Sequence, residues 1–112
     1  MTASSTQRID QTLETYMLAL AGLDQCPESA ALEVKTRLRE NVERAERAFA
    51  DASTGALAGE GPALGAALAD LAAANAAARA ALVGTRPIDA LLERLESATI
   101  EALRALKAAG RT

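Results

Sequence analysis

The sequence lacks the residues on which most enzyme sites depend. It has no histidine, no tryptophan and a single cysteine among 112 residues. Without histidine there is no Ser-His-Asp triad, no imidazole metal ligand and no imidazole acid or base. One cysteine excludes an internal disulfide and a cysteine-rich zinc site. We therefore expect no catalytic residue, no metal site and no cofactor.

Aromatic side chains and positive charge are scarce as well. Tyr16 and Phe49 are the two aromatic residues, and 15 acidic residues outnumber 12 basic ones, for a formal net charge of −3. A nucleic-acid-binding protein usually combines a positive field with aromatic rings on which bases stack. The composition therefore predicts that nucleic acid is not a partner.

Alanine and leucine dominate what is present. The chain has 29 alanines and 16 leucines but only three valines and three isoleucines. Alanine and leucine are strong helix formers, whereas β-branched residues favour strands. Half of the residues are hydrophobic, which is enough for one buried core in a chain of this size. We expect a single all-α domain over residues 1–112.

Proline and glycine divide the chain into four periodic segments. Each of the three prolines stands near the beginning of such a segment, where a missing backbone N–H costs nothing. The predicted helices cover 4–23, 27–53, 62–83 and 86–109, and the longest loop covers 53–61. Short loops favour antiparallel neighbours, so the predicted fold is an up-down-up-down four-helix bundle.

An alternative architecture is a set of long helical hairpins that complete a bundle by dimerisation. The predicted helix over 27–53 is longer than its neighbours. A helix that outruns its partners in one chain can bury its extra length against a second copy. This mismatch keeps the alternative open.

The predicted first helix carries an apolar stripe that we expect to face the core, because its members recur every three or four residues. These members are Ile9, Leu13, Tyr16, Met17, Leu20 and Leu23. Leu18, Leu32 and Ile100 do not fit the stripes of their own helices. We predict that these three are exposed and contact a partner or a second copy if their helices pack together.

Asn75 is the most informative polar residue. It lies in the middle of a stripe with three-four spacing, formed by Leu68, Leu71, Ala78 and Leu82. A buried amide needs hydrogen-bond partners, and a polar residue at such a position often fixes helix register or oligomeric state. We interpret Asn75 as a buried register residue, with a ligand or partner contact as the alternative.

Carboxylates on different helices suggest a second function, a metal-dependent enzyme within a bundle. Its candidate residues are Glu40, Glu43, Asp70, Glu93 and Glu96. Helical carboxylate sites usually combine glutamates with inward-pointing histidines. The helical positions of these acids diverge, and Glu40 precedes Arg44 by four residues, a spacing typical of solvent-exposed ion pairs.

The segment 62–83 is long enough to cross a membrane but contains Asp70 and Arg79. Each charge costs about 2.5–3.5 kcal/mol near the bilayer centre, which alanine does not offset. We therefore predict a buried soluble helix and no membrane partner. The N-terminus lacks the basic and apolar regions of a secretory signal, so we expect a cytoplasmic protein.

Taken together, the sequence has amphipathic helices in excess and few side chains suited to catalysis. This combination is typical of a non-catalytic protein–protein interaction module, such as an adaptor, chaperone-like or assembly protein. The expected partner is another protein or a second copy of the chain, with a homodimer as the simplest assembly.

Overall fold

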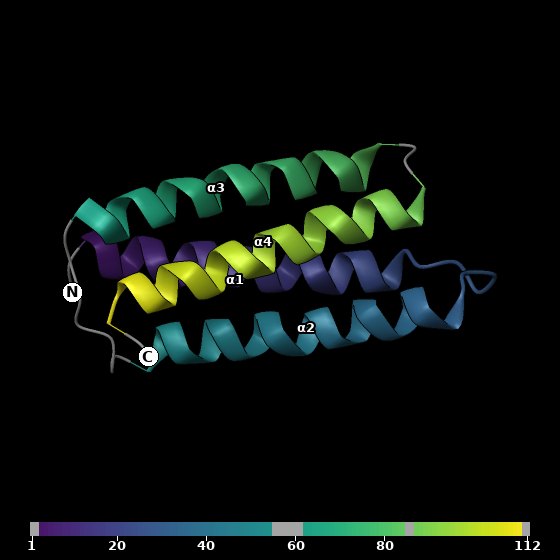
Figure 1. The fold of residues 1–112 in the computed structure, drawn as a ribbon, viewed down its shortest axis with the longest axis horizontal. Coiled ribbons are helices and arrows are strands. Elements are labelled where there is room, and N and C mark those ends of the chain that lie inside the picture. The colour runs from purple at the N-terminus through teal and green to yellow at the C-terminus, as the bar shows by residue number, and fades with distance from the viewer. Residues whose placement is uncertain (1–2, 55–61, 85–86, 111–112) are drawn as a thin grey trace.

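The computed structural model describes residues 3–54, 62–84 and 87–110, which form four helices and no strand. The helices are α1 (Ala3–Asp24), α2 (Leu32–Ser53), α3 (Pro62–Val83) and α4 (Ile88–Ala108). Their directions alternate along the chain, and they form a rod of 44 × 21 × 18 Å (Figure 1). The predicted all-α, up-down-up-down bundle is therefore confirmed.

The predicted start of the second helix at Pro27 is wrong. Pro27 lies in a turn in which its carbonyl oxygen accepts the N–H of Ala30 at 3.0 Å. Ala31 is then extended, with φ −60° and ψ 147°, and caps a helix that begins at Leu32. All four helices are 21 or 22 residues long, which removes the length mismatch that favoured hairpins joined by dimerisation. Most of the predicted loop, 55–61, lies outside the described residues.

The helices are arranged as two hairpins, α1–α2 and α3–α4, packed side by side. Contacts join α1 to α3 and α2 to α4 along the sides of the bundle, and α1 to α4 across its shorter diagonal. No Cα atom of α2 lies within 8 Å of one of α3 in the part of the chain described. Figure 1 shows α3 and α2 at the outer edges, with α1 and α4 between them.

A glycine permits the close approach of α1 to α4. Gly22 is buried, and a Cβ atom built on it would lie 2.2 Å from Cδ1 of Leu95. Real carbon atoms do not approach this closely, because repulsion rises steeply inside van der Waals contact. The missing side chain of Gly22 therefore leaves the space that a core leucine of α4 fills.

The core consists of two apolar clusters, one toward each end of the rod. One cluster gathers Leu64, Leu68, Leu71 and Leu106, and the other gathers Leu18, Leu38, Leu91, Leu92 and Leu95, each with buried alanines. Between them, near the middle of each helix, lie buried polar side chains. We call these the central polar layer: Thr12, Thr15, Asn41, Asn75 and Thr99.

Helix α3 is less buried than its composition predicts. By length and apolarity it is the one described helix able to cross a membrane, yet 28% of its most apolar window is buried inside the bundle. One side packs on α4 and α1 through leucines, Asn75 and Ala78, while alanines and the charged Asp70 and Arg79 face outward. The expectation that this helix is buried is therefore wrong for the side of α3 that faces outward.

Candidate interaction surface

Helix α1 carries two parallel stripes, and the structure buries the one that is less apolar. The expected stripe begins at Ile9 and continues through Leu13, Tyr16, Leu20 and Leu23. The buried stripe is displaced by one residue and consists of Arg8, Thr12, Thr15, Ala19 and Gly22. One residue corresponds to a rotation of about 100° around the helix axis. Part of the apolar stripe of α1 is therefore turned away from the core.

The buried stripe tolerates this position because its hydroxyl groups find partners within the same helix. Thr12 donates to the carbonyl oxygen of Arg8 at 2.8 Å, and Thr15 donates to that of Gln11 at 2.9 Å. A buried hydroxyl that is hydrogen-bonded avoids most of the cost of leaving water. The small Ala19 and Gly22 complete a face that packs closely against α4.

Asn75 links this buried stripe to α3. Its Nδ2 donates to the backbone oxygen of Gln11 and to the side-chain Oε1 of Gln11, each at 3.0 Å. Its Oδ1 lies 2.8 Å from the Thr15 hydroxyl, whose single proton is shared between this oxygen and the carbonyl oxygen of Gln11. Asn75 is fully buried, as its position in the leucine stripe predicts. In these bonds Gln11 and Thr15 face α3.

The prediction that Leu18 is exposed is wrong, and the same rotation explains why. Leu18 lies on the side of α1 that faces α3 and α4, is 8% exposed and packs in an apolar cluster. Leu32 is the first residue of α2 and is exposed, and Ile100 is exposed in the middle of α4. Since Leu18 is buried, the three residues do not form a shared surface.

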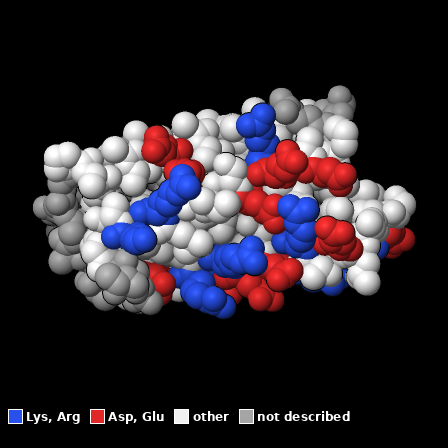
Figure 2. Space-filling view, in the orientation of Figure 1, with Lys and Arg blue, Asp and Glu red and all other residues white. Residues whose placement is uncertain are grey.

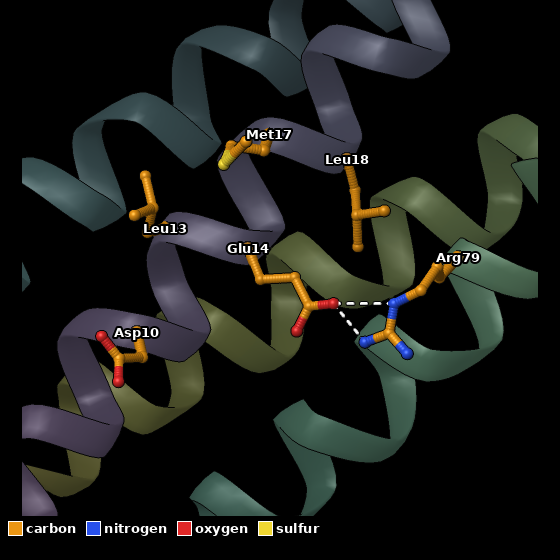
Figure 3. Close-up of a pocket in the computed structure, with 6 residues that line it drawn as sticks. All are labelled: Asp10, Leu13, Glu14, Met17, Leu18 and Arg79. Carbon is orange, nitrogen blue, oxygen red and sulfur yellow. Dashed lines mark hydrogen bonds and ion pairs between the residues drawn. The ribbon is translucent and has the colours of Figure 1, made fainter.

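The rotation instead exposes apolar residues of α1 on successive turns. Met17 is 59% exposed and Leu20 is 40% exposed, with Leu13 half-buried beside them. We call Leu13, Met17 and Leu20 the α1 apolar face. A hollow of about 330 Å³ borders it, lined by Asp10, Leu13, Glu14, Met17, Leu18 and Arg79 (Figure 3). Sequence reasoning missed this surface because it assigned these residues to the core.

Polar contacts hold both edges of the α1 apolar face. In Figure 3, Glu14 and Arg79 point toward each other, and their ion pair joins α1 to α3. On the other edge, the Tyr16 ring stacks on Phe49 with centroids 6.3 Å apart, and its hydroxyl donates to Glu46 at 3.1 Å. This hydrogen bond to a carboxylate raises the pKa of Tyr16 above its usual 10.0. Helix α1 is thus fixed from both sides.

Acidic and basic side chains alternate on the opposite side of the bundle. Figure 2 shows them interspersed where α2 and α4 lie, with few charges along α3. Glu96 accepts hydrogen bonds from Nε and Nη2 of Arg37 at 3.2 and 2.5 Å, so the positive charge of Arg37 balances its negative charge. Among the described residues, no group of three or more cysteine or carboxylate side chains is placed to hold a metal ion. The five carboxylates of the enzyme hypothesis are not brought together.

Asn41 is a second buried amide that sequence reasoning missed. It is 1% exposed on α2, and both its Nδ2 and Oδ1 are buried without a hydrogen-bond partner. The signal was present, because Asn41 follows Leu38 by three residues and precedes Ala45 by four. In contrast to Asn75, its amide leaves hydrogen bonds unmade.

Comparison of the chain with protein-family models, curated proteins and solved structures gives no match.

Proposed function

We propose that the protein is a non-catalytic interaction module that binds a helical segment of a partner protein on the α1 apolar face. The supporting observation is the rotation of α1, which buries threonines and leaves Met17 59% and Leu20 40% exposed. A single exposed apolar residue is ordinary, whereas neighbouring ones on one helix favour a contact surface. Ile100 and Leu103 form a second exposed pair on α4, but the hollow lined by Leu13 and Met17 lies beside the pair on α1. Residues 13, 17 and 20 have the spacing with which one helix packs on another.

The surface is organised before a partner arrives. Asn75 hydrogen-bonds to Gln11 and Thr15 of α1, and the contacts of Glu14 and Tyr16 join the two edges of α1 to α3 and α2. A rigid surface loses little conformational entropy on binding, so more of the burial energy appears as affinity. Binding would proceed by burial of the apolar face against leucine-type side chains of the partner.

The proposal needs no cofactor or metal, and it places the protein in the cytoplasm, where an unpaired cysteine is ordinary. The carboxylate enzyme hypothesis has no comparable support, since its acids lie apart and Glu96 is paired with Arg37. Self-association remains an alternative occupant of the same surface, and the experiments below separate it from binding of another protein.

The test uses a synthetic amphipathic helical peptide with leucines on one face and an uncharged polar face. We expect Met17→Ser to weaken its binding about tenfold, because a largely buried methionine contributes about 1.5 kcal/mol. Ile100→Ser is the matched control, since it removes an exposed apolar residue from α4 without a change in charge. Titration calorimetry measures both.

Equal losses in the two variants would show nonspecific apolar binding and overturn the proposal. A loss confined to Ile100→Ser would move the site to α4. Unfolding curves of both variants verify that each remains folded. We expect the unfolding free energies to change by about 0.5 kcal/mol or less, because both residues are exposed.

A further inference from the structure

We propose that the partner segment is a basic amphipathic helix of another protein, with lysine or arginine flanking its apolar face. This inference rests on the proposed function of the α1 apolar face. It follows from the charges that border this face and from what a second copy of the chain would place against them.

The ionic side chains that α1 exposes are all acidic. Its acids are Asp10, Glu14 and Asp24, and its one basic residue, Arg8, is buried in the core-facing stripe. Asp10 lines the hollow beside Met17 (Figure 3). Because Glu14 is paired with Arg79, the unpaired negative charge that an approaching helix meets on α1 is that of Asp10 beside the apolar residues. Complementary charge on the partner both orients it and speeds association.

The charged residues of the neighbouring helices leave the net charge around the middle of α1 negative. Arg79 of α3 is paired with Glu14, so it contributes little free positive charge. Glu46 of α2 lies on the other edge as the acceptor for Tyr16. Cations also border the C-terminal end of α1, where Lys35 and Arg39 line a separate hollow. The cationic residues of the partner thus belong beside Asp10 and Glu46.

A second copy of this chain fits the surface poorly. An antiparallel α1–α1 pair centred on Met17 places Asp10, seven residues before the centre, opposite Asp24, seven residues after it. A parallel pair places every acid opposite its own copy. Like charges in opposed positions destabilise helix pairs and act against the wrong partner. The same negative charge disfavours an anionic membrane surface.

The test compares three helical peptides that share one leucine spacing and differ in the polar face, which is lysine-rich, uncharged or glutamate-rich. We expect the lysine-rich peptide to bind about tenfold more tightly than the uncharged one, since two or three exposed ion pairs add up to such a factor. This advantage should shrink as salt is raised, because exposed charges are screened.

Paired carboxylate variants locate the effect. Asp10→Asn should weaken binding of the lysine-rich peptide about threefold and leave the affinity for the uncharged peptide unchanged. Asp70→Asn on α3 is the matched control, because it removes the same charge from an exposed position away from the α1 apolar face. Equal losses in both variants would indicate attraction by net charge alone and overturn the inference.

The outcomes also separate this inference from the proposed function. If all three peptides bind equally and Met17→Ser weakens each of them, the interaction surface stands but its preference for a basic partner is wrong. If none binds, the proposed function fails as well. If the free chain sediments as a dimer that Met17→Ser dissociates, the occupant is a second copy and the basic-helix inference is overturned.

Discussion

Helices α1 and α4 use opposite kinds of residues to face the same core. Helix α4 buries Leu91, Leu92 and Leu95 and turns its charged residues outward, together with Ile100 and Leu103. Helix α1 buries threonine, alanine and glycine and turns Met17 and Leu20 outward. The leucines of α4 fill the space that the small residues of α1 leave. The rotation of a helix in a bundle is therefore decided by fit to its neighbours as much as by its own apolar stripe.

This difference underlies the proposed function because it creates an exposed apolar surface on a helix that is held by contacts on both sides. Had α1 followed its own apolar stripe, its leucines would lie in the core and no α1 apolar face would exist. The contrast between the two helices can be tested by substitutions.

Leu95→Ala in α4 and Leu20→Ala in α1 compare the two helices with one chemical change. Leu95 is fully buried, so its truncation should cost about 3 kcal/mol of unfolding free energy through lost burial and a cavity. Leu20 is 40% exposed, and its truncation should cost less than about 1 kcal/mol. Urea unfolding measures both values. Similar losses would show that α1 is not rotated as described.

Asn75→Ala tests whether the amide holds α1 in its rotation. The substitution removes three hydrogen bonds and leaves the groups of Gln11 and Thr15 near a small cavity. We expect a loss of about 2 kcal/mol in unfolding free energy. Thr15→Val removes one of these bonds at nearly constant volume and should cost less. An unchanged stability in Asn75→Ala would mean that small-residue packing alone sets the rotation.

Asn41→Leu should act in the opposite direction. The amide of Asn41 makes no hydrogen bond in the core, so an apolar side chain of similar size should raise the unfolding free energy by about 1 kcal/mol. Asn75→Leu is the control, and it should destabilise the protein because its amide is bonded. A destabilised Asn41→Leu would indicate that a buried water or another polar group satisfies Asn41.

The smallest effect concerns the edge of the α1 apolar face. Tyr16 is the one tyrosine of a chain without tryptophan, so ultraviolet absorbance follows its ionisation directly. Its bond to Glu46 raises the pKa above 10.0. Glu46→Gln should lower the pKa toward 10.0, whereas Glu43→Gln, which removes the same charge nearby, should change it less. Equal shifts would contradict a specific bond.

The sign of the accompanying stability change follows from the direction of the pKa. Because the folded-state pKa of Tyr16 is raised, its bond stabilises the protein fully below the unfolded pKa of about 10 and is lost as pH rises through the folded value. The Glu46→Gln variant should therefore show a weaker loss of stability above about pH 10.

Sequence periodicity predicted the four helices, the bounds of α3 and the burial of Asn75, because each depends on residues within one segment. It was wrong about Leu18 and about the start of α2. Two stripes on α1 share the same three-four spacing, and apolarity alone favours the one that the structure leaves partly exposed. The turn at Pro27 depends on a hydrogen bond to Ala30, which a proline pattern alone does not specify.

Composition and spacing alone specify helices, because alanine and leucine at helical spacing favour them over strands. Packing between helices sets which face of α1 is buried. That choice depends on Gly22 meeting Leu95 and on Asn75 meeting Gln11 and Thr15. Each of these contacts joins different helices, and their geometry exists only once the bundle has formed.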